Sequence, residues 1–240
     1  MANIRNFANQ IQQAYTTQDE PLFSRLITID ISSPTVNALA QDLYHTKAMT
    51  NYMEVVRYLT SSDIDFVFET FANFYKSLIP VFSGSDTFFM LPVIKTLSTL
   101  LVQLAFRVDK MGLVGKARKA NTAARLVSKV FNTMLADRTP IETSKQQGIF
   151  HITNLVFKVY FKLNSVKMCQ TFISNISQSA LDLELFPISQ QVTYKYYTGR
   201  YSLYQGRLQH VSQKLDALFF HGHTLNPMFG IGSKLSLVCV

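Results

Sequence analysis

Apolar residues recur at helical spacing along nearly the whole of this 240-residue chain. From Ile4 onward, apolar positions follow at i+3, i+4, i+7 and i+11, which predicts a first helix with one buried side. Asp19-Glu20-Pro21, Ser33-Pro34 and Ser61-Ser62-Asp63 contain the residue types that favour helix starts. The second of them opens an expected helix over Thr35–Leu59. Because no alternating strand-like run accompanies these signals, the sequence predicts an all-α, TPR-like helical-repeat solenoid.

Two later segments carry the most information about packing. Residues 149–163 are apolar except for one narrow stripe, formed by His151, Asn154, Lys158 and Lys162. A helix with so little polar surface is expected to pack on several sides.

Residues 189–205 have the pattern of a helix sandwiched between two neighbours. We expect four residues on one side to be buried: Val192, Tyr196, Gly199 and Leu203. A mid-helix glycine costs up to about 1 kcal/mol relative to alanine. Gly199 is therefore expected to mark a close approach of another helix.

Residues 88–106 have the length of a membrane span, but Pro92, Lys95, Ser98 and Gln103 interrupt the apolar run. A lysine near the centre of such a span costs roughly 3 kcal/mol of insertion free energy. We therefore expect a buried helix and no membrane contact. The two cysteines exclude a disulfide framework, and the amino terminus has no apolar segment typical of a signal peptide.

The net charge of +8 comes entirely from the second half of the chain. Residues 1–106 contain 6 Lys and Arg against 9 Asp and Glu, whereas residues 107–240 contain 17 against 6. Such a basic half attracts nucleic acid or an acidic protein segment. The candidate residues for this contact are Lys116, Arg118, Lys119, Arg125, Lys129, Lys158 and Lys162.

The core of this basic set is a ridge, in which Arg118, Arg125 and Lys129 are spaced at i, i+7 and i+11. That spacing is expected to place the three side chains on one face of a helix. An ordinary solvated helix face would give the same pattern, and this alternative stays open. No pattern predicts a catalytic, cofactor-binding or metal-binding residue, so the expected class is a binding protein and not an enzyme.

The most specific motifs are NLVFKVYFKLN at 154–164 and VTYKYYTGR at 192–200. Together with the sequence between them, they resemble the PCI-domain-containing protein 2 family, also described as signalosome-subunit-12-like. The resemblance covers roughly residues 90–220. It identifies the following as family packing residues: Asn154, Phe157, Tyr160, Tyr194, Tyr196, Tyr197, Gly199 and Arg200.

The resemblance implies a scaffold or adaptor subunit of the nuclear transcription-and-export complex, which couples transcription to messenger RNA export at the nuclear pore. The implied partners are a large GANP-like scaffold subunit and a small, very acidic DSS/SEM-type subunit. The implied location is the nucleus, with some protein in the cytoplasm. An alternative is a scaffold of the signalosome or the proteasome lid, because related helical-repeat modules serve those assemblies.

The chain departs from the family pattern after about Phe220, where a tail follows in place of further helices and a winged helix. We therefore expect three regions: N-terminal helical hairpins over 1–85, a PCI-type helical-repeat region over 86–220, and a divergent tail over 221–240. The expected truncation before the winged helix would weaken RNA binding.

Overall fold

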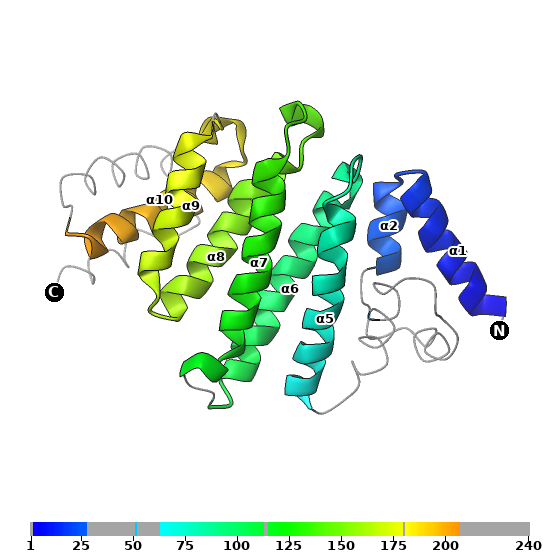
Figure 1. The fold of residues 1–240 in the computed structure, drawn as a ribbon, viewed down its shortest axis with the longest axis horizontal. Coiled ribbons are helices and arrows are strands. Elements are labelled where there is room, and N and C mark those ends of the chain that lie inside the picture. Colours follow the sequence, from blue (N-terminus) through cyan, green and yellow to red (C-terminus); the bar gives the residue numbers. More distant parts are fainter. Residues whose placement is uncertain (1, 28–50, 52–62, 113–114, 180, 207–240) are drawn as a thin grey trace, which may run out of the picture. The chain divides into compact units, whose positions relative to one another are not determined.

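The structure is a computed structural model that describes residues 2–27, 51, 63–112, 115–179 and 181–206, in which every regular element is helical (Figure 1). The α-helices are α1 (Ala2–Thr16), α2 (Glu20–Ile27), α5 (Ile64–Phe82), α6 (Leu91–Asp109), α7 (Lys119–Ala136), α8 (Ile149–Lys162), α9 (Cys169–Gln178) and α10 (Ile188–Tyr204). Short 3-10 helices are η1 (Phe88–Met90), η2 (Gly115–Ala117), η3 (Ile141–Thr143), η4 (Lys145–Gly148), η5 (Val166–Met168) and η6 (Leu183–Leu185). The expected helix over 35–59 lies outside the described residues apart from Asn51, and so does the tail over 221–240.

The chain divides into two compact units, Met1–Cys169 and Gln170–Val240. In the first unit, each of the helices α5 to α8 packs against the next one along the chain. Helices α5 and α7 also contact each other, as do α6 and α8, so the four helices form two layers (Figure 1). This arrangement confirms the all-α, helical-repeat fold. The expected region boundaries at residues 85 and 220 stay predictions.

Helix α6 occupies the centre of the first unit, and its apolar composition reflects this position. By length and hydropathy, Phe88–Asp109 is the one described segment that could cross a membrane, and 56% of its most apolar window is buried inside the protein. Pro92 lies in the first turn, where no hydrogen bond is lost. On the side toward α5, the Tyr75 hydroxyl lies 2.6 Å from the Ser98 hydroxyl, which donates to the Ile94 carbonyl.

The start signals in the sequence are confirmed where the structure describes them. Asp63 accepts hydrogen bonds from the Asp65 and Phe66 amides and so caps α5. Asp19 accepts from the Leu22 amide at 3.0 Å at the start of α2. Three rings then fix α1 and α2 on η1, because Tyr15, Phe23 and Phe89 lie with their centroids 5.4 to 6.3 Å apart.

A buried lysine joins the loop after α5 to the loop after α7. Lys145 is only 8% exposed, and its Nζ donates to the Gly84 carbonyl at 2.6 Å and lies over the Phe82 ring. Asp137 fixes the second loop by accepting four hydrogen bonds, from Thr139, Ser144 and Lys145. These contacts hold the two loops together at one end of the first unit.

Helix α10, in the second unit, corrects one expectation. Tyr196 and Leu203 are 43% and 42% exposed, Val192 is half-buried, and only Gly199 of the four expected residues is buried. A Cβ atom added at Gly199 would have no neighbour within 4 Å, so no helix approaches closely there.

The buried side of α10 is instead formed by residues with polar groups, namely Gln191, Thr198, Tyr201 and Ser202. Their polar atoms find partners inside the unit, since Gln191 donates to the Phe186 carbonyl and Tyr201 donates to Gln170. Burial of these groups is tolerated because each is hydrogen-bonded. A pattern of hydrophobic residues alone could not identify this side.

Candidate partner-binding surface

The structure removes Arg118 from the expected basic ridge. Helix α7 begins at Lys119, so Arg118 has extended backbone geometry and precedes the helix. Its Nε lies 3.5 Å from Asp109 Oδ2, and the Asp109 side chain is only 3% exposed. Asp109 also accepts hydrogen bonds from the Lys119 and Ala120 amides, at 2.6 and 3.2 Å. Asp109 therefore caps α7, and Arg118 balances its charge.

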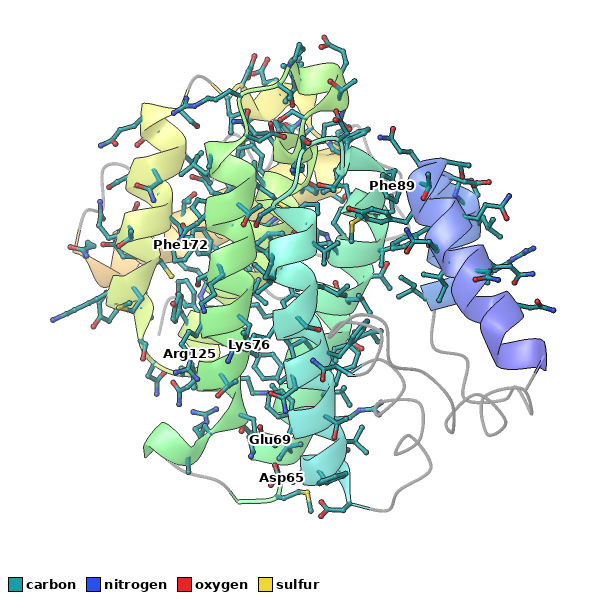
Figure 2. The ribbon with its side chains drawn as sticks, turned by 45° about the vertical axis from the view of Figure 1, so that its right-hand side comes forward. Asp65, Glu69, Lys76, Phe89, Arg125 and Phe172 are labelled. Carbon is teal, nitrogen blue, oxygen red and sulfur yellow. The ribbon has the colours of Figure 1, made fainter. Side chains whose placement is uncertain are left out.

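Lys119 is also neutralised by nearby acids. Its Nζ lies 2.8 Å from Asp65 Oδ1 and 2.6 Å from Glu69 Oε1, both near the start of α5 (Figure 2). Partial burial lowers the pKa of Lys119, but hydrogen bonds and charge from the two carboxylates outweigh this effect, and the pKa is raised. The ammonium group is thus held in its charged form and joins α7 to α5.

Two ridge residues remain exposed on α7, Arg125 and Lys129, and Arg125 is marked in Figure 2. Lys116 lies in η2, and its side chain is outside what the structure describes. The i, i+7, i+11 spacing therefore does not produce a three-residue ridge, because the helix starts one residue after Arg118.

Lys158 and Lys162 lie on α8, in the layer opposite to α7, and both are exposed. The Lys162 Nζ lies 4.2 Å from the centroid of the Phe106 ring of α6. Arg118 Nη1 donates to the Lys162 carbonyl at 3.4 Å. The candidate cations whose side chains the structure describes are thus divided between α7 with the residue before it and α8, and Arg118 is brought to the Lys162 carbonyl.

Helices α6 and α8 together present a surface with cations and almost no acid. We call it the α6–α8 surface and define it by Lys95 and Arg107 of α6 and Lys158 and Lys162 of α8. The single acid in these two helices is Asp109, which is buried and occupied by Arg118. The α6–α8 surface therefore attracts negatively charged groups.

A pocket of about 410 Å³ lies at one end of the α6–α8 surface. It is lined by Pro92, Lys95, Thr96, Thr99, Leu100 and His151. The Thr99 hydroxyl donates to the Lys95 carbonyl at 2.9 Å and lies 3.1 Å from His151 Nε2. Burial and the Lys95 charge lower the pKa of His151, so the ring is neutral at pH 7. Lys95 is therefore the charged side chain among the residues that line this pocket.

Sequence reasoning selected Lys158 and Lys162 but missed Lys95, Arg107 and the pocket. Two features of the sequence could have pointed to this surface. One is the polar stripe on the otherwise apolar residues 149–163, and the other is residues 91–109, which contain two cations and one acid. They could not be read as one surface, because residues 95–107 and 151–162 become neighbours only when α6 packs beside α8.

The described residues contain no group of three or more His, Cys, Asp or Glu side chains that could hold a metal ion. Cys169 is buried, and burial raises the pKa of its thiol to about 12, which makes it a poor nucleophile. Of the family packing residues, Asn154 and Phe157 are buried in α8 and Tyr160 is half-buried. Arg200 is exposed on α10.

No family model matches the chain. Among curated proteins, it is 26% identical over 252 residues to a PCI domain-containing protein of Schizosaccharomyces pombe, which covers 91% of this chain and 56% of that protein. It is 44% identical over 85 residues to a CSN12 homolog of Neurospora crassa, covering 34% of this chain and 19% of the relative. It is 34% identical over 102 residues to PCI domain-containing protein 2 of Danio rerio, and the match covers 42% of this chain and 25% of that protein.

The chain spans about half the length of the S. pombe protein. Several further matches have the same two kinds of name, including a PCI domain-containing protein 2 homolog of Dictyostelium discoideum at 34% identity over 92 residues. The resemblance to PCI domain-containing protein 2 and the CSN12 homologs is therefore confirmed.

Proposed function

We propose that this chain is a non-enzymatic scaffold subunit of a nuclear messenger RNA export complex. Its relatives are named as PCI-domain proteins, and helices α5 to α8 of its first unit pack in two layers, an architecture that offers long binding surfaces. The observation that carries the proposal is the α6–α8 surface, whose two helices contribute four cations and a single acid, Asp109, which is paired with Arg118. A scaffold subunit of this kind would hold other subunits of the complex together by binding them on such surfaces.

The proposed partners are a GANP-like scaffold subunit and a small acidic DSS/SEM-type subunit. Acidic side chains of the small subunit would pair with Lys95, Lys158 and Lys162. An apolar side chain of the same segment would enter the pocket beside Leu100. Charge pairs at a surface mainly determine specificity and the association rate, whereas the buried apolar side chain adds affinity.

The test is a binding titration of the full chain with the purified acidic subunit. The double variant Lys95→Glu/Lys158→Glu reverses two charges on the α6–α8 surface, and Arg125→Glu/Lys129→Glu makes the same net charge change on α7. We expect the first variant to bind at least about tenfold more weakly, since attraction becomes repulsion. The affinity of the second variant is expected to stay within about twofold of the parent. At physiological salt, charges farther apart than about 8 Å are largely screened, so charges on α7 should affect a partner on the α6–α8 surface only weakly. Equal losses in both variants would show that only net charge matters.

A second candidate is a PCI scaffold of the signalosome or the proteasome lid, which the CSN12 homologs among the relatives favour. Purification of the tagged chain from nuclear and cytoplasmic extracts distinguishes the two. Recovery of the GANP-like subunit from the nuclear fraction supports the export complex. Recovery of signalosome or lid subunits supports the alternative and refutes the first proposal.

A further inference from the structure

The loop between α7 and α8 contains Thr139 followed by Pro140, at one end of the first unit (Figure 1). Arg138, Thr139 and Pro140 are all exposed and lie in no helix. The backbone on both sides of Thr139 is extended, since ψ is 128° at Asp137 and 145° at Pro140. A residue that precedes proline is itself held near extended conformations. Thr139 therefore presents an accessible hydroxyl group in an extended segment.

A hydroxyl residue followed by proline is uncommon in this chain. Of its seven prolines, Pro34 and Pro140 are the two that follow a serine or threonine, and Pro34 lies outside the described residues. Proline has no backbone amide hydrogen, and one class of protein kinases selects the acceptor hydroxyl by the proline that follows it. Because protein substrates bind along a kinase cleft as extended segments, both the sequence and the conformation at Thr139 suit this class.

The Thr139 hydroxyl also takes part in the hydrogen bonds that fix the loop. It donates to Asp137 Oδ1 at 2.9 Å, and the Thr139 amide donates to the same oxygen at 3.1 Å. The other oxygen, Asp137 Oδ2, accepts from the Lys145 amide at 2.8 Å and from the Ser144 hydroxyl at 3.2 Å. The Lys145 ammonium group donates to the Gly84 carbonyl, in the loop after α5. A chemical change at Thr139 Oγ1 therefore acts directly on the carboxylate that fixes this junction of two loops.

We propose that Thr139 is phosphorylated by a proline-directed protein kinase and that the phosphate loosens the loop from Asp137. In the transfer, Thr139 Oγ1 forms a bond to the γ-phosphorus of ATP. The bond between that phosphorus and the β–γ bridging oxygen breaks, and ADP leaves. The hydroxyl proton passes to the catalytic aspartate of the kinase, and nothing is oxidised or reduced.

The phosphate replaces an attraction by a repulsion. A phosphothreonine carries a charge of about −1.5 to −2 at pH 7, and its ester oxygen has no hydrogen to donate. That ester oxygen is the atom that lies 2.9 Å from Asp137 Oδ1, so the new charge is added beside a carboxylate. Phosphate next to an acidic side chain disrupts local structure by like-charge repulsion. The hydrogen bonds from Ser144 and Lys145 to Asp137 weaken as a result. This regulation does not depend on the proposed scaffold function.

The first test locates the phosphate. The full chain is incubated with ATP and a purified mitogen-activated protein kinase, and modified residues are identified by mass spectrometry of its peptides. We expect phosphate at Thr139 and none at Thr143, an exposed threonine of the same loop that is followed by serine. The Pro140→Ala variant keeps the acceptor hydroxyl but should lose the modification.

A Ser33→Ala substitution in every sample removes the other serine–proline pair, and circular dichroism confirms that each variant is folded. Three results overturn the assignment of the site. They are a parent chain without phosphate at Thr139, equal modification of Thr143, and a Pro140→Ala variant that is modified like the parent.

The second test measures the loop itself, by NMR of hydrogen exchange at the Lys145 amide in the full chain. We expect at least about threefold faster exchange after phosphorylation, because the hydrogen bond from this amide to Asp137 weakens. The Thr139→Val variant removes the hydroxyl without adding charge, so its exchange rate should lie between those of the parent and the phosphorylated chain. Unchanged or slower exchange after phosphorylation overturns the proposed loosening. A phosphorylated chain that exchanges no faster than Thr139→Val overturns it as well, since the added charge then has no effect.

Discussion

Two buried glycines give a sharp test of the packing, because the same substitution should have opposite effects. Gly199 lies within α10, and a Cβ atom built there has no neighbouring atom within 4 Å. Gly148 precedes α8, and its added Cβ would lie 2.6 Å from Leu91 Cδ1 and 3.0 Å from Met134 Cε. Both of these neighbours are themselves buried.

The Gly199→Ala variant should therefore be stabilised. Alanine in a helix interior is favoured over glycine by about 0.8–1.0 kcal/mol, and no steric cost opposes this gain. For a chain of this size, 1 kcal/mol corresponds to a rise in Tm of about 2–4 °C. Gly148→Ala should be destabilised by about 1–3 kcal/mol, because Leu91 and Met134 must move within a packed core.

The two free energies of unfolding are measured by denaturant titration followed by circular dichroism, with thermal unfolding as a second measure. The two variants serve as controls for each other, since both add one methyl group to a buried glycine. A destabilised Gly199→Ala variant would restore the close helix approach that the sequence pattern favours. A stabilised Gly148→Ala variant would refute the contacts assigned to the start of α8.

Two further predictions concern buried hydrogen bonds. Ser98→Ala should cost about 1–3 kcal/mol, because it leaves the Tyr75 hydroxyl buried without its partner, whereas Tyr75→Phe should cost only about 1 kcal/mol since Ser98 keeps the Ile94 carbonyl. Denaturant unfolding of both variants gives this order, and the reverse order would contradict it. At Asp137, burial raises the pKa, but four accepted hydrogen bonds outweigh burial and the pKa is lowered from 3.8. The ionised Asp137 carboxylate therefore stabilises the fold above pH 3.8, and this stabilisation is lost as the pH falls through the lower pKa of the folded state. Acid unfolding of the Asp137→Asn variant, followed by circular dichroism, should lack this part of the pH dependence.

Much of the fold follows from local chemistry in the sequence. The caps formed by Asp19 and Asp63 depend on amides two or three residues away, so the residue type and its position were enough to predict the helix starts. The apolar character of residues 149–163 likewise predicted a helix packed on several sides, and α8 is buried over most of its circumference. The motif at 154–164 carried the resemblance that the comparisons confirm.

The binding surfaces could not be predicted in the same way, because their properties depend on partners distant in the sequence. Arg118 and Lys119 looked like members of a ridge until Asp109, Asp65 and Glu69 were brought beside them by the packing of α5, α6 and α7.

The sequence by itself therefore determined the helices, their caps and the family resemblance, since these depend on spacing within one segment. Only the tertiary structure decided which cations on α7 remain available and that α6 and α8 form one surface. It also decided that Tyr196 of α10 faces outward while Gln191 is buried. The physical reason is that a polar side chain can be buried or neutralised only where another element supplies its hydrogen bond or opposite charge.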